Sequence, residues 1–267
     1  NSDLTFVLNS CAFTIGATAE AVFQNAAGQL ADYKMDTMDL IPQTVDISKT
    51  SIDWNVRTTV QSSGLLNSGY DNITADLNHE FDNQQIITTT PGSFFSKAVL
   101  ASSSAFVSPL IDTKRNSVIV VENIINNTTT GESELPAGGD AIAKYITRTV
   151  TLKDGFDAQD ITIYLTMNRR AGTQITCYYK ILSQYDFDAY EDKLWVEMQQ
   201  TSNLNTLSVD PEEFIEYQFD PTTANTNYSV GGATFTSFKT FAVKIVMTSA
   251  NTSIVPRVKD LRVIALA

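Results

Sequence analysis

The sequence predicts a mainly β protein, an antiparallel two-sheet sandwich of jelly-roll-like type with an N-terminal extension that contains a helix. Three observations lead to this fold class. Several short segments after residue 92 alternate apolar and polar residues, as the two faces of a half-buried strand require. Turn-forming Ser, Asn, Asp and Gly residues separate these segments. One segment near the N-terminus repeats its apolar residues at a helical spacing.

Residues 18–35 carry that spacing and are predicted to form an amphipathic helix. Thr18 is a partial cap, because Ala21 stands where a capping box has Glu or Gln. Gly28 lies inside the pattern and weakens the prediction. The apolar stripe consists of Ala19, Val22, Phe23, Ala26, Leu30 and Tyr33.

Strand patterns begin with Ile52, Trp54 and Val56, which alternate with polar residues. Residues 61–78 carry turn signals and are predicted to form a loop. Further strands are expected at 97–101, 105–111 and 117–125, and at these alternating sets: Ile146, Val150 and Leu152; Ile161, Ile163 and Leu165; Ile175, Cys177, Tyr179 and Ile181; Phe241, Val243, Ile245 and Met247; Leu261 and Val263.

Two details of this β region follow from the pattern. The link 168–173 is short enough to join the strands on either side of it as a hairpin. The residues expected inside the sandwich are Ile163, Leu165, Ile175, Val243 and Ile245.

We therefore expect an extension over residues 1–94 and a sandwich domain over residues 95–267. One helix and one strand are too little to bury a core, since small units cover a poor fraction of their surface. The apolar residues of the extension are expected to contact other subunits, and the candidate interface residues are Val22, Phe23, Leu30 and Trp54.

Composition argues against several classes of protein. The net charge is −12 and no Lys/Arg run offsets it, which disfavours nucleic-acid binding. No apolar run approaches the roughly 20 residues that span a bilayer, so membrane insertion is not expected. The two cysteines are not a disulfide framework, and we expect Cys177 to be a buried free thiol.

Residues with chemical potential are few. The one histidine, His79, cannot supply the imidazoles of most catalytic zinc sites and is expected at the surface or in a loop. Two carboxylate groups offer calcium ligands or a glycosidase pair, although Asp is also common in turns, which is the interpretation we favour. These groups are Asp154, Asp157 and Asp160, and Asp186, Asp188, Glu191 and Asp192.

Clustered aromatic residues offer a sugar-binding platform, but packing within the sheet is the interpretation we favour. They are Tyr178, Tyr185, Phe187, Tyr190 and Trp195. We assign no catalytic residue, no cofactor and no metal site from the sequence.

A longer pattern resembles a block that recurs in large virion structural proteins of contractile-tailed, myovirus-type phages, including phages of marine cyanobacteria. The resemblance spans roughly residues 95–267 and departs from the family at 169–171, where the family has a proline-containing turn. The matching segments are 107–112, 145–152, 155–158, 163–165, 172–175, 178–180, the acidic segment 190–198 that contains Trp195, 241–247 and 255–266.

The resemblance implies a structural role in the phage tail, in the baseplate or beside a fibre. It implies a protein of the virion, assembled in the host cytoplasm, whose partners are other virion proteins and copies of itself. It transfers no catalytic residues, so we expect an assembly protein and not an enzyme. The alternative is a carbohydrate-binding module that contacts a host glycan.

Overall fold

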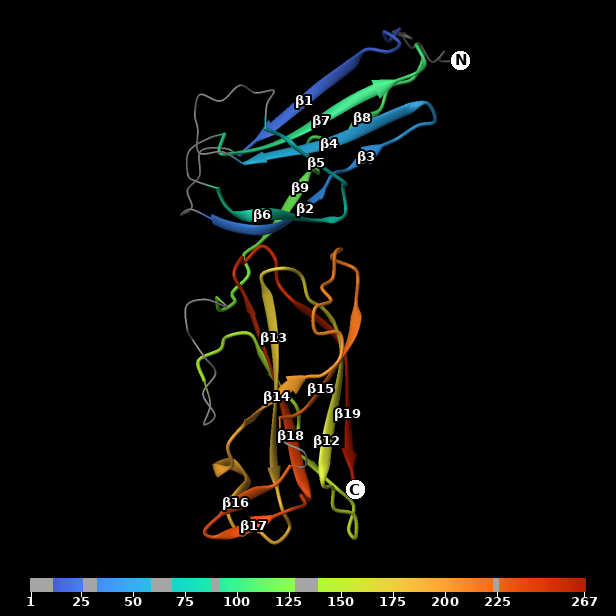
Figure 1. The fold of residues 1–267 in the computed structure, drawn as a ribbon. Coiled ribbons are helices and arrows are strands. Elements are labelled where there is room, and N and C mark those ends of the chain that lie inside the picture. Colours follow the sequence, from blue (N-terminus) through green and yellow to red (C-terminus); the bar gives the residue numbers. More distant parts are fainter. Residues whose placement is uncertain (1–11, 26–32, 59–68, 88–91, 128–138, 223–225) are drawn as a thin grey trace, which may run out of the picture. The chain divides into compact units, whose positions relative to one another are not determined.

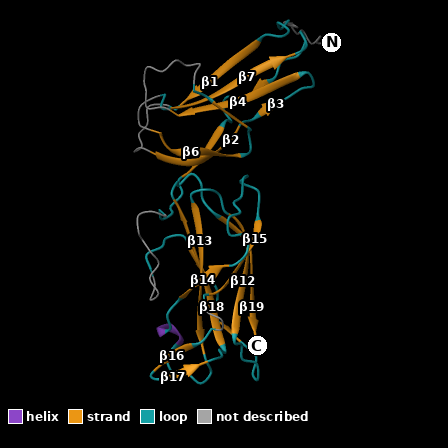
Figure 2. Ribbon diagram, in the orientation of Figure 1, coloured by secondary structure: helices purple, strands orange, loops and turns teal. Residues whose placement is uncertain are grey.

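The structure, a computed structural model, describes residues 12–25, 33–58, 69–87, 92–127, 139–222 and 226–267. The chain divides into two compact units, Asn1–Glu122 (unit 1) and Asn123–Ala267 (unit 2), each of which is described by itself (Figure 1). The fold is mainly β, as predicted (Figure 2). Every pairing between the named strands is antiparallel.

Unit 1 packs two antiparallel sheets around a core of its own. One sheet has the order β1-β7-β4-β5 and the other has the order β6-β2-β9, while β3 and β8 form a short separate ladder. The strands are β1 (Thr18–Gln24), β2 (Tyr33–Ile41), β3 (Thr44–Val45), β4 (Thr50–Thr58), β5 (Asp71–Ile73), β6 (Asn78–Ile87), β7 (Phe94–Ser102), β8 (Leu110–Ile111) and β9 (Ser117–Val121).

The core of unit 1 is contributed by both sheets. Met38 and Leu40 of β2 lie in one apolar cluster with Trp54 of β4 and Phe94 of β7, and all four side chains are buried. From the sequence, the boundary between extension and sandwich is expected at 94/95. Instead β7 pairs with β1 and β4 inside unit 1, and the boundary between the two units along the chain falls between residues 122 and 123.

The helix predicted over residues 18–35 is wrong. Thr18–Gln24 is strand β1, which pairs with β7 along its whole length, and Tyr33 begins β2. Ala21 and Phe23 pack on the core of unit 1 whereas Val22 is 42% exposed, so these residues also fit a period of two. Pairing with β7 and packing on the core outweigh local helix propensity. The remaining stripe residues, Ala26 and Leu30, lie outside the described residues.

Unit 2 is built on one eight-stranded antiparallel sheet of order β10-β18-β13-β14-β15-β12-β19, with β11 also paired to β18. A separate hairpin joins β16 to β17. The elements are β10 (Lys144–Ile146), β11 (Val150–Thr151), β12 (Asp160–Asn168), β13 (Thr173–Leu182), η1 (Tyr190–Asp192), β14 (Val196–Gln200), β15 (Ile215–Pro221), β16 (Tyr228–Val230), β17 (Ala233–Phe235), β18 (Thr240–Ser249) and β19 (Arg257–Leu266).

The eight-stranded sheet curls into a half-barrel around the core of unit 2. Strand β14 joins a half that contains β13 and β18 to a half that contains β12, β15 and β19 (Figure 1). The predicted core is confirmed, because the inward side chains are 0–4% exposed and lie in one cluster: Ile163, Leu165, Ile175, Val243 and Ile245. Because the sheet is continuous through β14, a two-sheet sandwich of jelly-roll type is not confirmed.

Cys177 belongs to the same core, as expected of a buried free thiol. Its side chain is fully buried on β13, and burial raises the pKa of the thiol to about 12. The thiolate is therefore strongly disfavoured at neutral pH, and this sulfur is chemically inert.

The predicted hairpin across 168–173 is wrong. Strand β12 pairs with β15 and β19, whereas β13 pairs with β14 and β18. The link crosses between the two halves of the curled sheet, and Arg169 fixes it there. The Arg169 guanidinium donates to the Oε1 of Gln200 at 2.7 Å and lies 5.0 Å from the centre of the Tyr217 ring. Loop length alone does not distinguish such an arch from a hairpin.

We expect residues 123–267 to fold alone, because the whole eight-stranded sheet and its core lie within this fragment. Urea unfolding followed by circular dichroism should show one cooperative transition. A fragment of residues 95–267 should gain no stability and aggregate more, since β7 and β9 then lack β1, β2 and β4. An unfolded 123–267 fragment beside a folded 95–267 fragment would contradict the division at 122/123.

Candidate functional site

A cluster of lysines and aromatic rings covers part of the outer face of the unit 2 sheet. Lys244 of β18 is 1% exposed, and its Nζ lies 4.5 Å from the centre of the Tyr178 ring and 5.1 Å from that of Trp195. The Nζ of Lys180 lies 5.1 Å from the Trp195 ring and 5.5 Å from the Tyr190 ring. Such cation–π contacts strengthen as the cation loses water, so the lysines and rings stabilise one another.

The register of the sheet creates this cluster. Tyr178 of β13 stands directly opposite Lys244 of β18, and Glu197 of β14 stands on the other side of Tyr178. Burial lowers the pKa of Lys180, the nearby Lys244 charge lowers it further, and Glu191 opposes both effects. The sequence pattern shows the aromatic residues but not the lysines they contact, because cross-strand partners depend on pairing.

The five aromatic residues therefore separate into two groups. Tyr178 is buried, while Tyr190 and Trp195 are partly buried and contact lysines, so these three rings pack on the sheet. Tyr185 and Phe187 are 67% and 100% exposed in the loop that follows β13. Only these two of the five are open to a ligand in the described part of the chain.

Of the four carboxylates predicted after β13, Glu191 and Asp192 are exposed, whereas Asp186 and Asp188 are held by a lysine. The Nζ of Lys193 lies 2.6 Å from the Oδ2 of Asp186 and 2.7 Å from the Oδ2 of Asp188. Tyr228 donates its hydroxyl proton to Asp186 at 2.8 Å, and the Ser183 N–H donates to the Tyr228 oxygen at 2.8 Å. The ammonium group occupies the position that a bound cation would need between these carboxylates.

The hydrogen bonds and charges of this ion pair shift the pKa values of both partners. Burial acts to raise the pKa of Asp186, but hydrogen bonds from Lys193, the Asp188 N–H and Tyr228 outweigh it and lower the pKa below 3.8. Burial acts to lower the pKa of Lys193, and its two carboxylate partners outweigh it and raise the pKa above 10.5. Burial, followed by the hydrogen bond to Asp186, raises the pKa of Tyr228 to about 12.

The carboxylates of the other predicted group, Asp154, Asp157 and Asp160, each contact a different residue and do not surround a common site. Asp154 lies 3.4 Å from the Nζ of Lys239, Asp157 accepts a hydrogen bond from Gln184, and Asp160 accepts one from the Ile161 N–H. Among the described residues, no group of three or more His, Cys, Asp or Glu side chains is placed to hold a metal ion.

A pocket of about 550 Å³ opens beside the Lys193 ion pair. Tyr179 and Tyr228 supply aromatic surface, and Asp188, Lys193 and Asn227 supply hydrogen-bonding groups. This mixture suits a polar organic ligand, since such sites combine apolar surface with a few polar groups.

His79 lies in strand β6 and not in a loop. It is partly buried, and its ring packs edge-on against Phe81 with centroids 4.8 Å apart. Its neighbour across the sheet is Met38 of β2, so this histidine is part of the packing of unit 1.

The candidate interface residues occupy different environments. Val22 is 42% exposed on β1, Phe23 is partly buried, and Trp54 is buried at 3% exposure in the core of unit 1. Trp54 is therefore not an exposed contact residue, because β7 and β5 pair on both sides of its strand and the core covers its ring. Leu30 lies outside the described residues.

A more exposed apolar surface, absent from the candidates above, lies on β9. Ile119 and Val121 share one face of the strand and are 50% and 41% exposed, and β9 stands at the end of its sheet. The sequence signal is the run Ser-Val-Ile-Val-Val, which predicts a strand but does not say that the strand lies at an edge.

Comparison with known protein families, curated proteins and solved structures finds no match to this chain. No helix within the described ranges is long and apolar enough to cross a membrane.

Replacing Asp186 by Asn should lower the free energy of unfolding by about 2 kcal/mol at pH 7, because Lys193 then keeps one carboxylate partner in a buried site. The stability due to Asp186 is present above its unfolded pKa of 3.8 and is lost as the pH falls through its lower folded pKa. Urea unfolding at pH 7 and pH 3 should therefore show a smaller difference between wild type and variant at pH 3.

Asp188→Asn is the matched control. Asp188 is 49% exposed, so its loss should cost less than about 1 kcal/mol. Equal costs for the two substitutions, or a cost of Asp186→Asn that is independent of pH, would contradict this account of the ion pair.

Proposed function

We propose that this chain is a structural protein of a phage virion, from the tail, the baseplate or a fibre-associated position, and that it acts in assembly. It is no enzyme in this proposal, and its partners are other virion proteins and copies of itself. The observation that carries the proposal is the exposed apolar edge strand β9 of unit 1. The resemblance of residues 95–267 to virion structural proteins gives the particle context.

Within the described residues, strand β9 is hydrogen-bonded to a neighbouring strand along one of its two edges only. It pairs with β2 on one side, from Thr37↔Val121 to Ile41↔Ser117, and within the described residues no strand pairs on its other side. An unpaired edge is a template for a strand of another chain. Natural edge strands are usually protected by charged residues, proline or bulges, but the sequence of β9 contains neither charge nor proline.

The apolar side chains of β9 support the same conclusion. Ile119 and Val121 are two residues apart and therefore share one face of the strand, where they are 50% and 41% exposed. Exposed apolar side chains on a strand whose edge is unpaired favour a contact with a strand of another protein. The acidic net charge of −12 disfavours a nucleic acid or an anionic membrane as that partner.

The same proposal treats the curled sheet of unit 2 as a jelly-roll-like, two-layered scaffold. Ile163 of β12 and Ile175 of β13 come from opposite halves of the sheet and lie in the same core cluster, as two packed layers require. Such a domain holds its shape without a ligand and can carry unit 1 in a larger assembly.

Replacing Ile119 by Lys should prevent self-association of the full chain, because the charge would have to enter an apolar strand contact. Sedimentation velocity over a range of protein concentrations should show oligomers for wild type and a monomer for the variant. Val209→Lys is the matched control, since Val209 is 88% exposed in a loop of unit 2. A monomeric wild type, or equal association of all three proteins, would contradict assembly through β9.

A second candidate function is carbohydrate binding, with a host glycan as the ligand. It is favoured by the full exposure of Phe187 and the 67% exposure of Tyr185, close in sequence to the pocket residue Asp188. An exposed aromatic ring offers a large, rigid apolar surface on which a ligand can pack.

Phe187→Ala should abolish binding on a glycan array if this second function is correct, because the exposed ring would supply the main contact surface. Phe106→Ala, at a phenylalanine that is 86% exposed in unit 1, should leave binding unchanged. An array on which wild type binds no glycan would exclude this function.

A further inference from the structure

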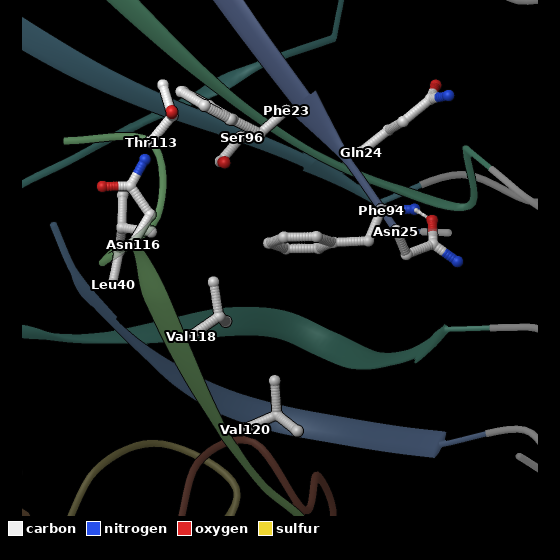
Figure 3. A pocket seen from close by; sticks show the side chains of 10 residues that line it. All are labelled: Phe23, Gln24, Asn25, Leu40, Phe94, Ser96, Thr113, Asn116, Val118 and Val120. Atoms are coloured by element: carbon white, nitrogen blue, oxygen red, sulfur yellow. Dashed lines mark hydrogen bonds between the residues drawn. The ribbon is translucent and has the colours of Figure 1, made fainter. Parts of the chain in front are cut away.

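Strand β9 presents side chains on two faces of its sheet. Figure 3 shows Val118 and Val120 along one wall of a hollow of about 390 Å³ between the two sheets of unit 1. Successive side chains of a strand point to opposite faces, so Ser117, Ile119 and Val121 lie on the other face, where all three are exposed. A strand that pairs with β9 therefore meets apolar side chains on both faces.

The hollow lies between strands at the ends of the two sheets. Phe23 of β1 and Val120 of β9 both line it, and β1 and β9 each stand at the end of a sheet. A strand added beside β9 would continue the sheet, and its inward side chains would extend the wall that Val118 and Val120 form (Figure 3). The partner strand must therefore be apolar on this face as well.

The residues that flank β9 carry opposite charges. Lys114 and Arg115 precede the strand and Glu122 follows it, and all three are exposed. Arg115 lies 3.5 Å from Asp112, and Glu122 lies 3.6 Å from Lys34, which belongs to β2 on the paired side of β9. Surface ion pairs of this kind are weak, so Lys114, Arg115 and Glu122 can still interact with charges of another chain.

These flanks make β9 complementary to itself. In antiparallel pairing centred on Ile119, Glu122 of one copy stands opposite Asn116 of the other copy, beside Arg115. Lys114 is then a diagonal neighbour of Glu122, at a separation that long side chains span. In parallel pairing Glu122 would meet Glu122 instead, and the basic residues would meet each other.

The net charge of the chain adds a further requirement. Each copy carries a net charge of −12, so two copies repel one another at long range. A contact between copies therefore needs an uncharged centre and opposite charges at its ends, as antiparallel pairing of β9 provides. Such a contact uses the same surface on both copies, which is the commonest arrangement in homodimers.

We propose that β9 pairs antiparallel with β9 of a second copy of this chain, about a twofold axis at Ile119. The sheet β6-β2-β9 then continues into β9-β2-β6 of the second copy. Ile119 faces Ile119 on the outer side, and Val118 faces Val120 beside the hollow. This inference rests on the proposed assembly role of β9 and names the partner and the direction of its strand.

Reversing either charged end should weaken self-association of the full chain. Glu122→Lys, and separately the double variant Lys114→Glu/Arg115→Glu, should each raise the dissociation constant by roughly tenfold at low salt, because like charges then meet at both ends. The two variants mixed in equal amounts should associate as tightly as wild type, since each supplies the charge that the other lacks. Sedimentation velocity over a range of concentrations measures all of these.

Asp71→Lys is the matched control for Glu122→Lys. It makes the same change of charge at an exposed residue of β5, which stands at the far end of the other sheet from β1. Its self-association should equal that of wild type. A loss as large as that of Glu122→Lys would show that net charge, and not the flanks of β9, controls association.

Disulfide formation tests the direction of the strands, with Cys11 replaced by Ser throughout. Ser117→Cys and Val121→Cys should form a disulfide-linked dimer when mixed and oxidised, because antiparallel pairing sets residue 117 of one copy opposite residue 121 of the other. Each variant alone should stay unlinked, because its two cysteines are then about 13 Å apart, beyond the reach of a disulfide. Linked dimers of each variant alone, with none in the mixture, would show parallel pairing and overturn the proposal.

The outcomes separate this inference from the assembly role on which it rests. If wild type associates and Ile119→Lys is monomeric, but the charge reversals have no effect and the mixed cysteine variants do not link, β9 pairs with a different strand. The inference is then overturned while the assembly role stands. A wild-type chain that is monomeric at every concentration overturns both.

Discussion

Unit 2 depends on the short strand β14, because its five residues join the two halves of the curled sheet. Val196 and Glu197 pair with β13, and the next three residues pair with β15. A second hydrogen-bonded pairing between the halves, within the described residues, is the isolated β-bridge between Ala158 and Phe238, near the ends of β12 and β18. These two connections bring the inner faces of β12 and β13 onto one core, and the lysine–aromatic cluster forms on the outer face that the same curl creates.

The sequence predicted the strands of unit 2 best where alternation is strict. Ile161, Ile163 and Leu165 of β12 all point into the core, as a period of two requires. The pattern fails at residues 18–24, where the apolar residues fit both a helical period and a strand period. Pairing with a strand more than 70 residues away decides in favour of the strand. The hairpin predicted across 168–173 is wrong because the direction of this short link depends on hydrogen bonds from Arg169 to residues 200–206.

The candidate sites show a similar limit. Composition and spacing identified the aromatic residues and carboxylates of unit 2, but not the lysines that neutralise or contact them. Lys193 is close in sequence to Asp186, so that ion pair could in principle have been found. Lys244 is 66 residues from Tyr178, so their contact follows only from the strand register.

The burial of Cys177 has a consequence for the durability of the protein. In the proposed virion role, the protein would leave the reducing interior of a host for oxygenated surroundings, where accessible thiols are converted to mixed disulfides or to sulfenic and sulfinic acids. The Cys177 sulfur has no exposed surface and its thiolate is suppressed, so neither oxidants nor other thiols can react with it at an appreciable rate. At this position the folded core keeps the same covalent structure in both environments, and a particle built from the chain would need no repair system to preserve it.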